Sequence, residues 1–331
     1  MRSLLSLLPL ALSATAHPSS THSEQVHHEA HAPLHEARAL PTAGLELGPH
    51  KSLLTGYSLT WQDEFNYPTT SPKQPSTSKW IYDIGTSYPG GPANWGSNEL
   101  QSYTNSINNI YITPEGWLRI VPRKESNGQW TSARIETVRK DFKARRGGKL
   151  FVEAKIKTGC AYPELQQGIW NAFWALGADF RGNYQNWPYT SEWDILEVIN
   201  GQNTIYNTLH CGTGPGGACN EPSGLSNGGV KWTKCAWHYV GFEVDRTQVT
   251  SAGVELWRNN KLTWYVDGVK THELTGRDVN DYDTWYKVAY QGHFLLLNVA
   301  IGGDWPGAPN SQTKDKASTR MMVDYVRVWN T

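Results

Sequence analysis

The sequence predicts an all-β protein, built as a sandwich or barrel of antiparallel strands. Short segments alternate between apolar and polar residues, as in Phe151–Lys157 and Met321–Trp329, which is the pattern of half-buried strands. Glycine and proline turns separate these segments, with 31 Gly and 18 Pro in 331 residues. No segment holds an apolar period of about 3.6 residues over three helical turns, which argues against a fold of alternating strands and helices.

The expected strands follow one another from the opening segment at Leu59–Phe65 to the C-terminus. Asn259-Asn260 and Asp267-Gly268 separate three of them and suit the primed turns of hairpins, so this part is predicted to be a meander. The expected strands are Trp117–Val121, Phe151–Lys157, Ile169–Trp174, Glu192–Ile199, Thr208–His210, Ala236–Val244, Val254–Arg258, Leu262–Val266, Val269–Leu274 and Met321–Trp329.

The N-terminal part differs in composition from the rest. Residues 1–16 resemble a secretory signal peptide, with an apolar run at 4–12 and a small-residue cleavage site at 14–16. Residues 17–50 carry seven of the 11 His without apolar periodicity, so we expect a disordered His-rich leader, with adventitious metal binding as the alternative. Residues 51–331 are expected to form one folded domain.

Charge and hydropathy exclude several kinds of partner. Basic and acidic residues balance at 30 each, so no net field attracts nucleic acid or an anionic membrane. The N-terminal apolar run is too short to span a bilayer, and no later segment is apolar enough. We therefore expect a secreted, extracellular monomer. No Asn-x-Ser/Thr acceptor for N-glycosylation occurs in the sequence.

The four cysteines suggest two disulfides in a secreted chain, with three possible connectivities. The Gly-rich loop between Cys211 and Cys219 closes easily, which favours the pairs Cys211–Cys219 and Cys160–Cys235. Zinc ligation is disfavoured because no two cysteines have the close spacing of a zinc-binding pair.

One predicted strand concentrates acidic side chains. Glu192, Asp194 and Glu197 lie among Trp, Ile, Leu and Val. Because side chains alternate along a strand, Glu192 and Asp194 share a face, whereas Glu197 has the opposite parity. A one-residue β-bulge near Ile195-Leu196 restores the parity, so that all three acids line one face and the apolar residues pack inward. Bulges are frequent beside active sites, so this spacing indicates a site.

The same spacing fits a reaction. With the bulge, the Cα atoms of Glu192 and Glu197 are about 13 Å apart at ~3.3 Å per residue, and leaning side chains bring the carboxyl groups to about 5 Å. Retaining glycosidases use about 5–5.5 Å and inverting ones about 6.5–9.5 Å. The alternative is a solvated acidic strand face, which repulsion between crowded like charges disfavours.

Other candidate residues have both a functional and a structural interpretation. The tryptophans of Ile169–Trp174 and Trp187 either line a cleft or fill the core, because flat rings with a polar edge suit both. His210 either reaches the acids or is an ordinary hydrogen-bonded histidine. The amides of Asn94–Gln101 either contact sugar hydroxyls or cap a turn. The interrupted basic run Arg139–Lys149 is interpreted as a solvated connector.

Nine segments in their order resemble glycoside hydrolase family 16, and within it the laminarinase-like endo-β-1,3(4)-glucanases, including secreted fungal members. The similarity extends from Tyr57 to Thr331, and nine segments in one order are far more specific than any single one. The segments are Trp61–Phe65, Trp95–Gln101, Thr131–Ile135, Gly168–Trp174, Glu192–Glu197, Thr208–His210, Trp264–Gly268, Asn298–Gly307 and Val323–Val328.

The resemblance implies a concanavalin-A-like jelly roll of two antiparallel sheets, with the substrate cleft along the concave sheet. By position, Glu192 resembles the nucleophile, Glu197 the acid/base, and Asp194 the acid that orients Glu192. No catalytic cofactor is implied. A structural Ca²⁺ near Asp324 would rest on one carboxylate, whereas such sites use six or more oxygens. The implied substrate contacts are Asn98, Arg134, Trp174, Trp187, His210 and Trp305.

The resulting expectation is retaining endo-hydrolysis of a β-1,3-glucan or a mixed β-1,3-1,4-glucan, through a covalent glycosyl-enzyme. The alternatives are a cell-wall transglycosylase, a β-1,3-galactanase and a non-catalytic glycan-binding module on the same fold. Transglycosylases of the family typically have the unbulged pattern E-x-D-x-E, whereas this chain has E-x-D-x-x-E. The intact acid trio argues against a binding module. The expected partner is a polysaccharide or oligosaccharide.

Overall fold

The computed structural model describes residues 45, 47–67 and 70–331. The predicted signal peptide and almost all of the predicted leader lie outside the described residues. The short 3₁₀ helix η1 (Pro49–Ser52) packs on the domain, and His50 is fully buried. The folded part of the chain therefore begins before residue 51, the boundary expected from composition.

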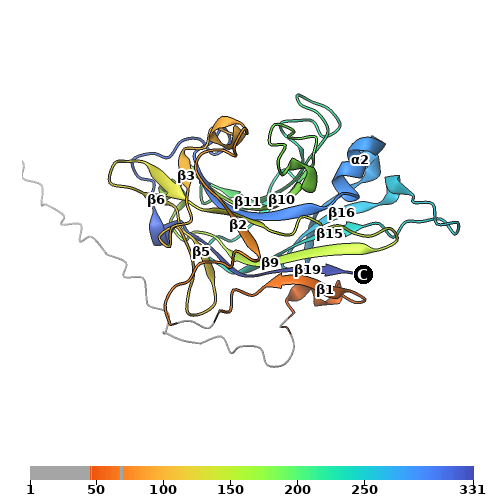
Figure 1. The fold of residues 1–331 in the computed structure, drawn as a ribbon, viewed down its shortest axis with the longest axis horizontal. Coiled ribbons are helices and arrows are strands. Elements are labelled where there is room, and N and C mark those ends of the chain that lie inside the picture. Colours follow the sequence, from red (N-terminus) through yellow and green to blue (C-terminus); the bar gives the residue numbers. More distant parts are fainter. Residues whose placement is uncertain (1–44, 46, 68–69) are drawn as a thin grey trace, which may run out of the picture. The chain divides into compact units, whose positions relative to one another are not determined.

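Two large antiparallel sheets make up most of the domain (Figure 1). We call the first sheet A. Its strand order is β17 (Val269–Thr275), β16 (Lys261–Val266), β15 (His238–Asp245), β9 (Lys149–Lys157), β19 (Met321–Asn330), β5 (Leu118–Ile120) and β4 (Ile110–Ile112), with β1 (Ser58–Asp63) also paired to β19.

The second sheet, sheet B, has the predicted acidic strand among its inner strands. Its strand order is β13 (Leu225–Ser226), β12 (Thr204–His210), β11 (Glu192–Ile199), β10 (Ile169–Gly177), β18 (His293–Ile301), β8 (Arg134–Thr137) and β2 (Trp80–Asp83), with β14 (Val230–Lys231) paired to β12.

The remaining elements are short. A small third sheet pairs β7 (Trp130–Ser132) with β3 (Gln101–Tyr103) in parallel and with β6 (Arg123–Lys124) in antiparallel orientation. The α-helices of the described residues are α1 (Gly276–Val279) and α2 (Tyr282–Ala289). The other 3₁₀ helices are η2 (Ala93–Gly96), η3 (Pro163–Leu165), η4 (Ala178–Phe180), η5 (Trp257–Asn259) and η6 (Lys316–Ser318).

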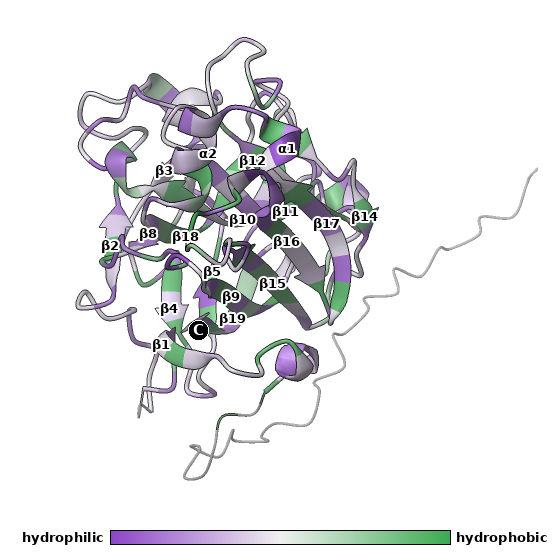
Figure 2. Cartoon of the chain, turned by 90° about the vertical axis from the view of Figure 1, so that its right-hand side faces the viewer, coloured by the Kyte–Doolittle hydropathy of each residue, from purple (hydrophilic) through white to green (hydrophobic). Residues whose placement is uncertain are grey.

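Apolar side chains from both sheets meet in one core. Phe173 and Trp193 of sheet B and Val152 and Phe242 of sheet A are all fully buried in it, and hydrophobic segments run along strands of both sheets (Figure 2). Burial of this apolar surface is the main force that holds the two layers together. The predicted fold class, an antiparallel jelly-roll sandwich, is confirmed.

One predicted strand is wrong. Val254–Arg258 forms no strand: Glu255 makes only an isolated bridge to Val249, and η5 begins at Trp257. The physical reason is that both edges of β16 are already paired, to β15 on one side and to β17 on the other. The segment therefore has no free edge of β16 to join, so the meander has two strands after β15 instead of three.

The disulfides are Cys160–Cys235 and Cys211–Cys219, as the sequence favoured. The first joins positions 75 residues apart, and the second closes a loop at the end of β12. In the described part of the chain, no helix combines the length and the apolarity needed to cross a bilayer.

Candidate active site

Strand β11 contains the predicted β-bulge. On the β10 side, the pairing skips one residue of β11 between Asp194 and Leu196. On the β12 side, the three steps from Asp194 to Glu197 face only two steps, from Thr208 to Tyr206. Both neighbouring strands therefore meet one extra residue at the position expected from the spacing of the acids. The bulge prediction is confirmed.

The bulge brings the three acids to one face of sheet B. Glu192, Asp194 and Glu197 all line a groove with a volume of about 870 Å³, whereas Trp193 and Ile195 are buried in the core below them. The groove crosses the sheet, because its lining residues come from β8, β18, β10, β11, β12 and β13 in turn. A linear polymer lying in it would run across the strands.

Burial and mutual repulsion set the charges of the acids. Burial, opposed by the charge of His210 and reinforced by that of Glu192, raises the pKa of Glu197 to about 7. Burial and then the charge of Glu197 raise the pKa of Asp194 well above its usual value. Burial also raises the pKa of Glu192, against the opposing effect of His210. Such shifts are typical of carboxyl groups that exchange protons near neutral pH.

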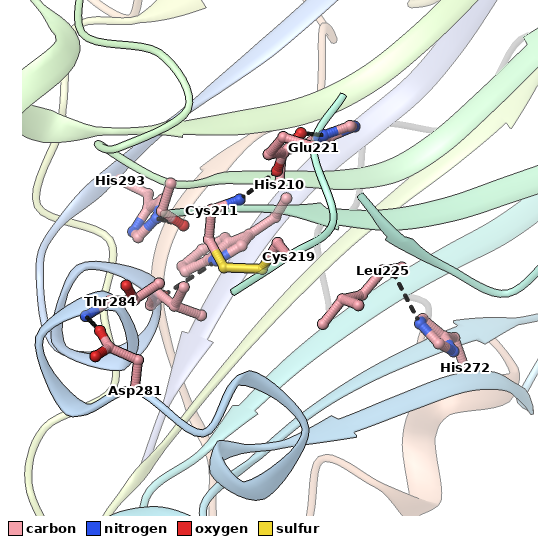
Figure 3. The surroundings of a disulfide bond; sticks show 12 residues. His210, Cys211, Cys219, Glu221, Leu225, His272, Asp281, Thr284 and His293 are labelled. Carbon is pink, nitrogen blue, oxygen red and sulfur yellow. Dashed lines mark hydrogen bonds and ion pairs between the residues drawn. A yellow bond between two sulfur atoms is a disulfide. The ribbon is translucent and has the colours of Figure 1, made fainter. Parts of the chain in front are cut away.

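His210 lies between the acids and a fourth carboxylate. Its Nδ1 is 2.7 Å from Glu221 Oε2, and its Nε2 is 3.5 Å from Asp194 Oδ2. Burial lowers the pKa of His210, but the hydrogen bond with Glu221 and the charges of the neighbouring acids outweigh it and raise the pKa. Figure 3 shows Glu221 next to His210 and close to the Cys211–Cys219 disulfide. His210 thus lies within reach of the acids and is also hydrogen-bonded.

Two indole N–H groups donate hydrogen bonds to the outer acids, Glu192 and Glu197. Trp187 Nε1 donates to Glu192 Oε2 at 3.2 Å, and Trp170 Nε1 donates to Glu197 Oε1 at 3.0 Å. Trp187 also packs against the His210 ring, with centroids 5.4 Å apart. Each bond favours the ionised form of its carboxyl group, because an N–H donor stabilises negative charge.

Arg134 lines the groove but is almost fully buried. Its Nε is 2.9 Å from Asp83 Oδ2, one of its terminal nitrogens donates to the Tyr88 hydroxyl, and its guanidinium lies over the rings of Trp95 and Trp174 at 4.7 and 4.8 Å. The charges of buried neighbours raise its pKa against the effect of burial. Arg134 therefore fixes the aromatic wall of the groove.

Two of the other predicted substrate contacts line the groove and one does not. Trp174 lines it and donates from Nε1 to Asn298 Oδ1 at 2.7 Å. Trp305 also lines it and is 43% exposed, so its ring is open to a ligand. Asn98 is not a lining residue: its amide donates to Asp304 Oδ1 at 2.9 Å, and Asp304 lines the groove.

The side chains that could ligate a metal ion coincide with the acid site. In residues 47–67 and 70–331, the candidate cluster of three ligands is Glu192, Asp194 and His210, the acid site itself. The predicted calcium position at Asp324 does not fit, because Lys155 Nζ already lies 3.0 Å from the buried Asp324 Oδ2. An ammonium group supplies the positive charge there, and it provides no oxygen ligand.

Known proteins resemble this chain in sequence and structure, although no family model matches it. Glucan endo-1,3-beta-glucosidase A1 of Niallia circulans is 30% identical over 302 residues, covering 85% of this chain and 39% of that protein. The chain thus spans less than half the length of this relative. The crystal structure of an endo-1,3-beta-glucanase from Streptomyces sioyaensis is 40% identical, with a TM-score of 0.76 over 83% of this chain and 97% of the other. The chain belongs to the laminarinase-like endo-1,3-β-glucanases of glycoside hydrolase family 16.

A more distant relative has a similar structure. An endo-beta-1,3-glucanase from Pyrococcus furiosus is 29% identical, with a TM-score of 0.62 over 82% of this chain and 94% of the other. These relatives are bacterial and archaeal, so the similarity to secreted fungal members stays a prediction.

The sequence did not predict the contacts of several groups of this groove. Trp170 is one of the tryptophans considered for the cleft and Asn298 lies in a segment that carried the resemblance, but no local pattern indicates their hydrogen bonds. Tyr88 and Glu221 gave no signal, because each comes from a loop without a recognisable pattern. Only the folded chain places these loops beside β11 and Arg134.

Proposed function

We propose that this protein is a retaining endo-β-1,3-glucanase, with Glu192 as nucleophile, Glu197 as acid/base and Asp194 as the acid that orients Glu192. The observation that carries the proposal is the bulge in β11, which turns all three acids into one groove. The predicted separation of about 5 Å between the outer carboxyl groups supports retention over inversion. The family membership supports the substrate class.

In the first step, a carboxylate oxygen of Glu192 attacks the anomeric carbon and the glycosidic C–O bond breaks. The leaving oxygen takes its proton from Glu197. In the second step, Glu197 removes a proton from water, the water oxygen bonds to the anomeric carbon, and the Glu192–sugar bond breaks. The anomeric carbon is displaced twice, so its configuration is retained.

The environment of each acid suits its role. Glu197 has a pKa of about 7 and is therefore mostly protonated in mildly acidic solution. The indole N–H of Trp187 and the charge of His210 favour the ionised form of Glu192 against burial. The pKa of both acids is raised by burial, so each can hold a proton closer to neutral pH than an exposed carboxyl group does, as a general acid must.

The shape and lining of the groove support a neutral polysaccharide as substrate. Trp174, Trp187 and Trp305 present rings that stack on the apolar faces of sugars. Because the lining residues extend across successive strands, a polymer can lie across the site and be cut internally. A mixed β-1,3-1,4-glucan is included in this proposal, since the groove offers contacts on both sides of the acids.

Mutation of the nucleophile tests the proposal. Glu192→Ala should abolish release of reducing sugar from laminarin, because no group is left to attack the anomeric carbon. Azide should restore turnover and yield a glycosyl azide of inverted configuration. Asp267→Asn, far from the groove, should retain wild-type activity. Full activity of Glu192→Ala without azide would contradict the assignment.

Product analysis separates hydrolysis from transglycosylation. NMR of early wild-type products should show the β-anomer first, as retention requires. Mass spectrometry should show shorter oligomers from laminarin; longer oligomers formed from short ones would indicate a transglycosylase instead. Panels with lichenan and β-1,3-galactan define the linkage and the sugar.

We also infer that the protein is exported and acts outside the cell as a monomer. The signal-like residues 1–16 and two disulfides support export, because disulfides persist in oxidising compartments. N-terminal sequencing of the secreted protein tests the cleavage after residue 16. Light scattering tests the monomer.

A further inference from the structure

Glu221 has no step in the reaction described above, yet it is bound into the acid cluster. It is 4% exposed, and its Oε1 accepts a hydrogen bond from the Cys211 backbone N–H at 2.8 Å. Its Oε2 lies 2.7 Å from His210 Nδ1 (Figure 3). On the other side of the ring, His210 Nε2 lies 3.5 Å from Asp194 Oδ2. A chain of polar contacts therefore runs from Glu221 through His210 to β11.

The loop that carries Glu221 is closed at two places. The disulfide Cys211–Cys219 joins the residue at which the loop leaves β12 to a residue shortly before Glu221. Gly216 and Glu221 exchange backbone hydrogen bonds in both directions, at 2.7 and 2.6 Å. The two residues that follow Glu221 line the groove. These constraints hold the Glu221 carboxylate at the end of β12, where His210 lies.

We propose that Glu221 is a positioning residue of the catalytic centre, which accepts the Nδ1 proton of His210 and thereby directs His210 Nε2 at Asp194. This inference rests on the proposed function. A carboxylate that binds one ring nitrogen decides the orientation and the tautomer of the imidazole, as the outer partners of metal-bound histidines do. Because Nδ1 keeps its proton for Glu221, a second proton on the ring sits on Nε2, the nitrogen 3.5 Å from Asp194 Oδ2.

That proton connects Glu221 to the outer acids. The groups that face His210 are Glu221 from the loop and Glu192, Asp194 and Glu197 from β11. Among the effects that raise the His210 pKa, the hydrogen bond with Glu221 is the largest. The charge of His210 in turn lowers the pKa of both Glu192 and Glu197. Glu221 therefore acts on the nucleophile and on the acid/base through His210.

The substitution Glu221→Gln tests this arrangement, because it keeps the side-chain length and removes the charge. In the full-length protein, an NMR titration of the His210 ring should give a lower pKa than in the wild type. For an oligosaccharide of β-1,3-glucan, kcat should fall by about tenfold to a hundredfold, the usual effect of losing such an outer partner, with a smaller change in KM. The acidic and alkaline limbs of the pH profile should both move.

A matched control is Asp267→Asn. Asp267 Oδ2 lies 2.6 Å from His238 Nδ1 in a surface hairpin, so the variant breaks the same kind of pair away from the groove. It should leave kcat, KM and the His210 titration unchanged. A second variant, Cys211→Ser with Cys219→Ser, keeps Glu221 but frees its loop, and it should lower both kcat and the His210 pKa less strongly than Glu221→Gln.

The outcomes are separable. Wild-type titration of His210 in Glu221→Gln would overturn the proposal, whether or not kcat falls, because Glu221 would then not act through His210. If Glu221→Gln does not fold, an unchanged His210 titration in the double cysteine variant would overturn it equally. A wild-type protein that cleaves no β-1,3-glucan would instead contradict the proposed function, while the titration would still test the geometry.

Discussion

Trp170→Phe isolates the effect of one hydrogen bond on Glu197. Burial raises the pKa of Glu197 to about 7, and the indole N–H of Trp170, 3.0 Å from Glu197 Oε1, opposes this rise. Phenylalanine retains an aromatic ring next to Trp305 but has no N–H. A hydrogen bond to a charged group contributes about 1.5–3 kcal/mol, and the protonated carboxyl group keeps part of it. A net loss of ~1 kcal/mol corresponds to roughly 0.7 pKa unit.

The sign follows from the role of Glu197. As proton donor it must be protonated, so activity falls as the pH rises through its pKa. Without the indole donor the ionised form is less stable, and the pKa rises. The alkaline limb of kcat/KM on a laminari-oligosaccharide should therefore move up by about half a unit to one unit. A stopped assay across the pH range between 5 and 9 (roughly two units either side of the pKa) measures it.

Trp174→Phe is the matched control. Its indole lines the same groove, but it donates to the Asn298 amide oxygen, at 2.7 Å, instead of an acid. The alkaline limb should stay in place in this variant, whatever happens to KM. An unchanged or lowered limb in Trp170→Phe, or an equal shift in Trp174→Phe, would refute the reasoning.

Three further predictions concern other parts of the domain. Deletion of Ile195 should leave reducing-sugar release from laminarin measurable, because without the extra residue Glu192, Asp194 and Glu197 have the same parity along a regular strand; a folded deletion variant with no activity would show that parity alone does not place the acids. Trp305→Ala should raise KM for laminarin about tenfold, with kcat little changed, because stacking of the indole on a sugar ring, about 1–2 kcal/mol, is lost. Steady-state kinetics measure both constants, and an unchanged KM would show that the ring does not contact substrate. His50→Ala should lower the free energy of unfolding by about 2–4 kcal/mol in urea titrations, because Oε2 of the buried Glu153 loses its 2.6 Å partner while Tyr325 still donates to Oε1; equal stability to wild type would contradict that estimate.

The sequence was informative where a local pattern determines the outcome. Alternation between apolar and polar residues located β9, β16 and β19, because side chains on a sandwich strand face either core or solvent. The odd spacing of Glu192, Asp194 and Glu197 located the bulge, because only one extra residue places all three on one face.

Long-range pairing was less accessible. Val254–Arg258 has a strand-like composition, but whether it forms a strand depends on a free sheet edge, and no local pattern reports this. Glu221 lies in a loop whose course depends on the Cys211–Cys219 disulfide and on contacts with β12. Asn98 has a motif-like context, yet its amide is occupied by Asp304, 206 residues away in the chain.

The anchoring of His50 also has a practical consequence. Its ring is held by Glu153 of β9 and by the backbone N–H of Gly268, so residues 47–50 cross the outer surface of sheet A. The acids open on sheet B, on the other side of the sandwich. A reporter or an immobilisation handle fused ahead of residue 47 would thus join the domain on its back, leaving the mouth of the groove free for a polymer or an insoluble particle.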